Sequence, residues 1–522
     1  MPKPVQASTY TFRNLIEGGF LYVDKTRYLY ALVHPTTGIY FLARPRRFGK
    51  SLMLSTLEEI FLGNRALFKG LWIDSSDYDW RPYPVIRFDF SSNSVNSAEN
   101  LERFLDYYIA KVARTYGVTL RGFDYQSNLV ELIEGVAQTG KVVLLIDEYD
   151  KPLIDHLQNL SEAVKIREVL KKFYTVIKAM DRHLRFVFIT GISKFSKVGV
   201  FSAMNNLTDL TMNAHFATAL GITEEELTTC FQEHIAEFAH KERLAFTAML
   251  AKIREWYNGF CFVEECAPVY NPFSTLQLFF SQRFSNYWFD SGTPTFLIKL
   301  LQEQQYDIEQ LDDLHLRELA FSTYELENLS IVPLLFQTGY LTIKDFEPQR
   351  RIYTLSYPNT EVKDAFLAHL LGKFSERDRS LNENYLWQLV DALEAHDLDQ
   401  FFRIMQIFFA NVPYNIHLKH EKYYQTIFYL IFKLLGLRVE AEVYTNQGRI
   451  DAVVEVAKYI YLFEFKLDKN ATEALQQIKK NAYYQKYRHK AKPLTLIGAN
   501  FDSSKRQVTE WRHTADVADG DA

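Results

Sequence analysis

The chain has 522 residues, too many for one hydrophobic core, and this length predicts three or four domains. Hydrophobic residues make up 48% of it and aromatic residues 15%, which excludes a disordered chain. The net charge of -5 excludes a globally basic nucleic-acid-binding protein, so any such surface has to be local, as in the basic clusters at 44–47 and 479–492.

Hydropathy and cysteine usage exclude further classes. No stretch approaches the roughly 20 apolar residues of a membrane span, and residues 1–6 lack the apolar core of a signal peptide, so we expect a cytoplasmic protein with no membrane partner. The three cysteines, Cys230, Cys261 and Cys266, form no C-x-x-C pair. We therefore expect reduced thiols, without a disulfide framework or a zinc site.

The first elements are a lead-in over residues 10–36, with a helix from Lys25 that Asp24 would cap, and an apolar strand over 39–43. A basic turn follows and ends in Gly49-Lys50-Ser51, before an apolar helical pattern over 52–62. In a nucleotide-binding loop the lysine reaches the β- and γ-phosphates and the hydroxyl ligates magnesium. The predicted ATP-binding residues are Arg46, Arg47, Phe48, Gly49, Lys50, Ser51 and Leu52.

The loop departs from the general pattern G-x-x-x-x-G-K-[ST], because Arg44 stands where the first glycine is expected. Glycine permits a tight turn there, so spacing alone leaves a phosphate site and a chance basic turn equally open. A second motif favours the phosphate site. The apolar strand at 141–147 ends in Asp147 and Glu148, which would hold the magnesium shell and polarise the attacking water. The alternative is a buried strand with a solvated acidic end.

Two more apolar strands, at 84–91 and 184–191, alternate with helical patterns at 97–116, 128–139 and 164–180. This alternation predicts a doubly wound, largely parallel sheet. Thr190 or Ser193 would sit at the carboxyl edge of that sheet and sense the γ-phosphate, with Lys194 a weaker candidate. A hydroxyl at a strand end is as often only a helix cap.

The loop Arg44-Pro45-Arg46-Arg47-Phe48-Gly49-Lys50-Ser51-Leu52 and the upstream Tyr22-Val23-Asp24-Lys25-Thr26 resemble the AAA-ATPase-like family of bacterial proteins. The resemblance includes the arginine in place of the first glycine. It implies an ATPase core over 1–215, a helical lid over 216–293 and a PD-(D/E)XK nuclease-like domain at the C-terminus. Two aromatic turns of the lid, 256–260 and 270–274, also recur in that family, although their residues alone predict only turns.

After the lid, residues 294–375 combine helices with a predicted hairpin of strands at 340–344 and 351–355, as in a winged-helix-like region. Such a region binds DNA or packs against the core, and without a basic excess we favour packing. Residues 376–415 form a helical connector whose apolar faces predict a packed segment rather than a loose linker.

The second chemical constellation lies in residues 416–513. A helix begins at Glu421, a strand follows at 437–443, and strands at 448–456 and 459–466 carry Asp451, Glu464 and Lys466. Side chains alternate along a strand, so Glu464 and Lys466 share one face and Phe465 points away. A hairpin would bring Asp451 beside them, so that Asp451 and Glu464 could hold Mg²⁺ for attack on a phosphodiester, with Lys466 orienting the water.

This order resembles the PD-(D/E)XK nucleases. Asp451, Glu464 and Lys466 match the core motif, Glu421 the acidic residue of the first helix, and Gln477 a residue on the helix after the motif strands. An E-x-K pattern alone is common, and a surface salt bridge on a hairpin is the alternative. A strand at 493–499 would complete the sheet, and we expect a disordered tail over 514–522.

Two hypotheses follow. The first is an enzyme that binds ATP and Mg²⁺, hydrolyses ATP and uses nucleotide state to control cleavage of DNA or RNA. The second is a nucleotide-dependent switch or scaffold whose nuclease-like domain only holds nucleic acid or a protein partner. The metal triad favours the first, whereas the acidic net charge slightly favours the second. The oligomeric state stays open, with a homo-oligomer among the alternatives.

Overall fold

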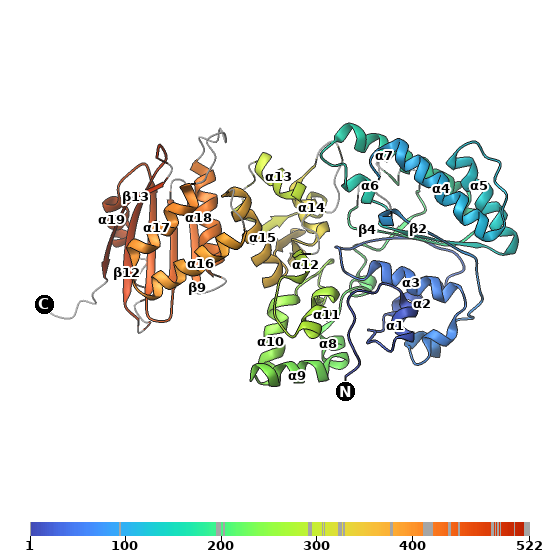
Figure 1. Ribbon diagram of the computed structural model, residues 1–522, viewed down its shortest axis with the longest axis horizontal. Coiled ribbons are helices and arrows are strands. Elements are labelled where there is room, and N and C mark those ends of the chain that lie inside the picture. Colours follow the sequence, from blue (N-terminus) through green and yellow to red (C-terminus); the bar gives the residue numbers. More distant parts are fainter. Residues whose placement is uncertain are drawn as a thin grey trace. The chain divides into compact units, whose positions relative to one another are not determined.

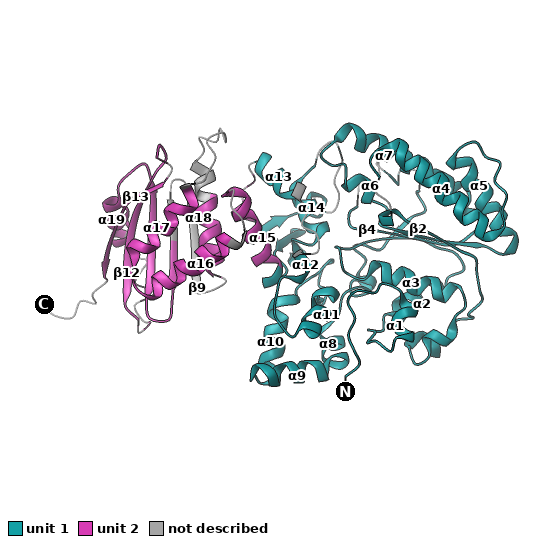
Figure 2. Cartoon of the chain, viewed as in Figure 1, with its two compact units in different colours: residues 1–304, 311–361 teal, residues 305–310, 362–522 magenta. Residues whose placement is uncertain are grey.

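The computed structural model describes the chain except at 1, 93–94, 195–199, 202–203, 291–294, 305, 307, 322–325, 327–328, 376–378, 411–420, 437–439, 447–448, 482–484, 486, 488–489, 491, 506 and 516–522. Side chains at 290, 295–296, 379–380, 410, 421–425, 440–446, 449–451 and 481 also lie outside the description. The chain divides into two compact units, residues 1–304 with 311–361 and residues 305–310 with 362–522 (Figure 2).

The first unit is built on a five-stranded sheet in which every pairing is parallel. Its strands are β1 (Ile39–Ala43), β2 (Val85–Asp89), β3 (Val142–Asp147), β4 (Leu184–Gly191) and β5 (Thr208–Asp209), in the order β2-β3-β4-β1-β5. β3 and β4 are buried along their whole length, as expected for strands covered on both faces. The predicted doubly wound parallel sheet is therefore confirmed.

Helices cover both faces of this sheet (Figure 1). On one face, Leu54, Leu57 and Phe61 of α3 pack with strand residues such as Leu145 and Phe188. On the other, Phe173 of α7 meets Phe88 of β2 at 5.2 Å between ring centroids. The helices of this part are α1 (Phe12–Glu17), α2 (Thr26–Val33), α3 (Lys50–Phe61), α4 (Ala98–Tyr116), α5 (Tyr125–Val136), α6 (Lys151–Ile154) and α7 (Leu160–Ala179).

The lid region is helical, as its sequence predicts. It contains α8 (Glu224–Cys230), α9 (Gln232–Glu242), α10 (Phe246–Tyr257), α11 (Pro272–Ser281) and α12 (Tyr287–Asp290). Thr223 and Glu226 form a capping box that starts α8, and three glutamates stand in its first turn, where the helix dipole favours them. The helices share a core of their own, which includes Leu227, Phe231 and Ile253.

The predicted hairpin after the lid is also present. β7 (Thr342–Glu347) and β8 (Ile352–Ser356) pair antiparallel, and β6 (Leu314–Leu316) adds a third strand in the order β6-β8-β7. α13 (Thr295–Glu303) and α14 (Ile331–Thr338) complete this winged-helix-like region.

The second unit contains a mixed sheet in the order β13-β12-β11-β10-β9. β11 and β12 run parallel and the other neighbours antiparallel. The elements are α15 (Thr360–Phe374), α16 (Arg379–Glu394), α17 (Leu398–Ala410), α18 (Glu421–Gly436), β9 (Glu440–Asn446), β10 (Arg449–Glu455), β11 (Ile460–Leu467), α19 (Ala471–Asn481), β12 (Leu494–Asp502) and β13 (Gln507–Ala515).

One expectation for the C-terminus is wrong. Thr514 and Ala515, placed in a disordered tail, belong to β13, which pairs antiparallel with β12. The strand was missed because Trp511 is the one apolar residue among Thr509–Thr514, so the stretch lacks the apolar alternation of a half-buried strand, and hydrogen bonding to β12 supplies the order instead. The rest of that tail, 516–522, lies outside the described residues.

Where the structure describes the chain, no helix combines the length and apolar character needed to cross a membrane.

Candidate functional sites at two sheets

The strand order brings three predicted site segments to one edge of the parallel sheet. β4 lies between β1, which leads into the Gly49-Lys50 loop, and β3, which ends in Asp147. Because parallel strands end at the same edge, the loop, the end of β4 at Thr190 and the acidic end of β3 are neighbours. This edge is the first candidate site.

The loop after β1 presents unused backbone donors. Gly49 caps α3 at a φ of 94°, and Arg47 has a φ of 64°. In the described part of the chain, the amides of Phe48, Gly49, Lys50 and Ser51 donate to no hydrogen-bond acceptor. Successive free amides at a helix N-terminus suit a phosphate group.

Lys50 lies inside this loop. Its Nζ donates to the carbonyl oxygens of Arg44 and Pro45, each at 2.9 Å. Burial lowers the pKa of Lys50, while the negative charges of Glu148, Asp147 and Asp150 act in the opposite direction. The ammonium group is thus placed between the loop and the acidic strand end.

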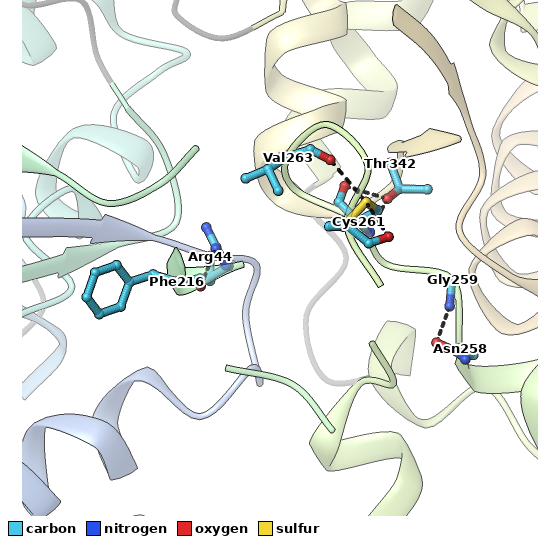
Figure 3. Close-up of a disulfide and its surroundings, with 8 residues drawn as sticks. Arg44, Phe216, Asn258, Gly259, Cys261, Val263 and Thr342 are labelled. Carbon is cyan, nitrogen blue, oxygen red and sulfur yellow. Dashed lines mark hydrogen bonds between the residues drawn. A yellow bond between two sulfur atoms is a disulfide. The ribbon is translucent and has the colours of Figure 1, made fainter. Parts of the chain in front are cut away.

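Arg44 supports the loop from the protein interior and is not exposed at its surface. Its side chain is only 1% exposed, and the guanidinium donates to the carbonyls of Ala43, Thr211 and Phe216 at 2.9, 2.8 and 3.3 Å. It also stacks on the Phe262 ring at 4.3 Å (Figure 3 shows the bond to Phe216). Arg44 has no positive φ, so the position does not need glycine.

Asp147 is held on both of its oxygens. Thr190 Oγ1 donates to Oδ1 at 2.7 Å, and Arg87 Nη2 lies 3.4 Å from Oδ2. Arg87 also contacts Glu58 of α3 at 3.3 Å, so it links β2, β3 and the helix after the loop. The sequence analysis missed Arg87, and only the strand order, which puts β2 beside β3, would have suggested it.

Glu148 and Asp150, which follow Asp147, differ in burial. Glu148, at a φ of 49°, is half-buried, and burial raises its pKa despite the charge of Lys50. Asp150 is fully buried, and its Oδ2 accepts from the amides of Ile192 and Ser193 and from the Ser193 hydroxyl. Ser193 is therefore a hydrogen-bond partner of Asp150, whereas the Lys194 ammonium forms an ion pair with Asp209 at 2.6 Å. Of the three sensor candidates, Thr190 is the one bonded to Asp147.

An apolar cavity of about 140 Å³ adjoins the loop. Its lining residues come from the N-terminal segment (Gln6, Ala7, Thr9, Tyr10, Leu15, Leu21, Tyr22, Val23, Lys25 and Leu29), from the loop and α3 (Arg47, Phe48, Gly49, Leu52 and Met53) and from the lid (Ala219, Leu220, Gly221, Ile222, Pro272, Phe273 and Leu276). A mostly apolar cavity beside free backbone amides suits a nucleobase next to its phosphates.

The expectation of reduced thiols is wrong for two of the three cysteines. Cys261 and Cys266 form a disulfide with their Cα atoms 6.0 Å apart (Figure 3). The antiparallel bridge between Phe260 and Val269 closes this short loop and brings the sulfurs together, which no C-x-x-C pattern signals. The Cys261 backbone also bonds through both N–H and C=O to the Thr342 hydroxyl of β7.

The second candidate site lies on the mixed sheet. Asp451 of β10 pairs directly with Glu464 of β11, so both positions share one face of the sheet. Lys466 Nζ lies 3.0 Å from Glu464 Oε1, and both side chains are buried. Phe465 packs on the opposite face against Phe428 and Phe432, as predicted. Glu421 begins α18, but its side chain and that of Asp451 lie outside the described residues.

Helix α19 covers the face that carries Glu464. Gly498 of β12 is the register partner of Glu464, and a Cβ at Gly498 would lie 2.4 Å from the Ala471 carbonyl oxygen. The helix therefore sits directly on the strand beside Glu464, and Gln477 is half-buried on it. Among the side chains that the structure describes, no three His, Cys, Asp or Glu form a metal cluster, but Asp451 is not among them.

Comparison with known proteins matches a family model to each of the two parts of the chain that contain these candidate sites. Residues 6–201 match the family model described as a predicted AAA-ATPase, and residues 419–511 match the PD-(D/E)XK nuclease superfamily. The chain is 38% identical over 512 residues to an uncharacterized protein in the vnfD 5'region of Azotobacter chroococcum mcd 1, covering 95% of this chain and 96% of that protein. The chain therefore belongs to the family of predicted AAA-ATPase-like proteins and carries a C-terminal domain of the PD-(D/E)XK nuclease superfamily.

Proposed function

We propose that the chain binds and hydrolyses ATP in its N-terminal core, residues 1–215, and cleaves DNA or RNA phosphodiesters in its C-terminal domain, residues 416–513. Nucleotide state would control the cleavage. The observation that carries the proposal is the convergence of Lys50, Asp147, Glu148 and the free loop amides at one sheet edge.

At this edge each residue has a role that its surroundings support. The amides of Phe48 to Ser51 and Lys50 bind the phosphates, and the apolar cavity receives the base. Glu148 polarises the attacking water, because it is the carboxylate of the strand end that is neither clamped nor fully buried. Thr190 fixes the orientation of Asp147.

The residue types at both positions suit magnesium. Ser51, whose hydroxyl makes no hydrogen bond within the described residues, and Asp147 would hold it beside ATP. Asp451 and Glu464, as register partners, would hold it in the C-terminal domain, together with the Phe465 carbonyl. When bound, the ion would supply positive charge to phosphate oxygens and lower the pKa of a water molecule at the site. Lys466 would orient that water, with Glu421 and Gln477 flanking the site.

The test is an assay of the full chain with magnesium, ATP and a mixture of DNA and RNA substrates. Lys50→Ala should lose ATP hydrolysis by roughly 100-fold and reduce cleavage. Glu464→Gln should lose cleavage by a similar factor and keep ATP hydrolysis, because the glutamine preserves shape but removes a metal ligand. Lys69→Ala and Glu473→Gln, both at exposed positions, are the matched controls.

The same assay distinguishes the enzyme hypothesis from its alternatives. A wild type that hydrolyses ATP and never cuts would favour the scaffold hypothesis. Cleavage that survives in Lys50→Ala and is lost in Glu464→Gln would make the two sites independent and contradict nucleotide control.

A further inference from the structure

Two turns in the lid share the pattern Tyr-Asn-x-Phe: Tyr257-Asn258-Gly259-Phe260 and Tyr270-Asn271-Pro272-Phe273. Their third residues differ for structural reasons. Gly259 has a φ of 102°, and a Cβ there would lie 2.1 Å from the Pro358 carbonyl oxygen. Pro272 instead occupies the first turn of α11, which the buried Asn271 caps by accepting from Ser274 N at 3.1 Å.

The phenylalanine of each turn contacts the predicted phosphate loop. Phe260 meets Phe48 edge to face, with ring centroids 4.9 Å apart. Phe273 lies under the guanidinium of Arg47, 4.5 Å from the ring centroid to Cζ. Arg47 and Phe48 are consecutive and directly precede Gly49-Lys50. The two lid turns therefore contact neighbouring residues of the loop that presents the free amides of Phe48 to Ser51.

Arg47 is the loop residue that needs such support. Its φ of 64° lies in the left-handed region, which is unfavourable for any residue with a Cβ. Two contacts hold its side chain, the stacking on Phe273 and a hydrogen bond from Nη1 to the Tyr10 hydroxyl at 3.0 Å. Because the amides of Phe48 to Ser51 follow directly, their direction depends on the backbone of Arg47.

We infer that Phe273 is a positioning residue of the nucleotide site: through Arg47 it holds the phosphate loop in the left-handed turn that aims the loop amides at a phosphate. Phe260 supports the next residue, Phe48, in the same way. The inference rests on the proposed ATP site and adds how the lid sets the conformation of the loop.

A double-mutant cycle separates this role from a direct contact with ATP. Kd for ATP is measured by isothermal titration calorimetry on the full chain with magnesium, for wild type, Phe273→Ala, Arg47→Gly and the double variant. Phe273→Ala should weaken binding about fivefold, the effect of one half-buried cation–π contact. Glycine adopts a positive φ without cost, so in the Arg47→Gly background Phe273→Ala should add less than about a twofold loss.

Two further variants complete the test. Phe280→Ala removes an exposed phenylalanine from the same helix, α11, and should leave Kd unchanged. Tyr10→Phe removes only the other contact of Arg47 and should weaken binding about threefold, the effect of one hydrogen bond, even if Phe273→Ala does not fold.

The outcomes that overturn the inference are specific. An equal loss from Phe273→Ala in both backgrounds would assign Phe273 to direct contact with ATP, and wild-type binding by Phe273→Ala and Tyr10→Phe would remove any role in the loop. If wild type and Phe280→Ala fail to bind ATP, the proposed function itself fails and the inference falls with it.

Discussion

The replacement Arg44→Gly would restore the general nucleotide-loop pattern, yet we expect it to destabilise the protein. The guanidinium donates to three carbonyl oxygens and stacks on Phe262. Hydrogen bonds to a charged group contribute roughly 1.5–3 kcal/mol each, and the stacking adds about 1 kcal/mol. Against this, burial lowers the pKa of Arg44 to about 9, which corresponds to a cost of about 5 kcal/mol for keeping the charge inside.

The favourable interactions exceed that cost, and glycine adds backbone freedom to the unfolded chain. We therefore expect Arg44→Gly to lose about 3 kcal/mol of unfolding free energy, seen as a fall of roughly 1 M in the urea midpoint. Arg44→Lys keeps the charge and should lose less, although its single nitrogen cannot reproduce the planar fork that reaches the carbonyls from Nη1 and Nη2. Arg65→Ala, which breaks an exposed pair with Asp74, should cost less than about 1 kcal/mol.

The pH dependence of this effect has a definite sign. Because burial lowers the folded pKa of Arg44 to about 9, below its ordinary value, the unfolded chain binds more protons above about pH 9. The contribution of Arg44 is therefore constant at neutral pH, and its unfavourable part fades as pH rises through 9. An Arg44→Gly variant that unfolds at the wild-type urea concentration and binds ATP more tightly would refute this account of the loop.

Two further predictions concern one site each. Thr190→Val removes the hydrogen bond that fixes Asp147, so ATP turnover should fall about tenfold while calorimetry gives a Kd within about twofold of wild type; unchanged turnover would contradict this role. Gly498→Ala puts a methyl group 2.4 Å from the Ala471 carbonyl oxygen and 2.6 Å from the Leu475 amide, so α19 has to shift. That variant should lose about 1–3 kcal/mol in thermal unfolding and its cleavage activity, but keep ATP hydrolysis, and wild-type cleavage would argue against a site under α19.

The sequence predicted the parts of this protein whose signal is local. The apolar runs at β1, β3 and β4 identify buried parallel strands, and Gly49-Lys50-Ser51 stands at the strand-to-helix turn where a phosphate loop is predicted. Alternation along β11 places Glu464 and Lys466 on one face, because a strand fixes the direction of its side chains residue by residue. The aromatic turns of the lid were recognised as turns because Asn-Gly and Asn-Pro are also local signals.

What depends on strand order and on contacts between distant segments could not be predicted. Arg87 contacts Asp147 only because β2 lies beside β3, and the Ser193 hydroxyl donates to Asp150. The disulfide needs the bridge that closes its loop, and β13 is a strand only through its bonds to β12. The sequence alone therefore determined which residue types are available and in what local geometry. The tertiary structure decided which of them meet, since a hydrogen bond or ion pair forms only between groups that the fold brings within about 3 Å.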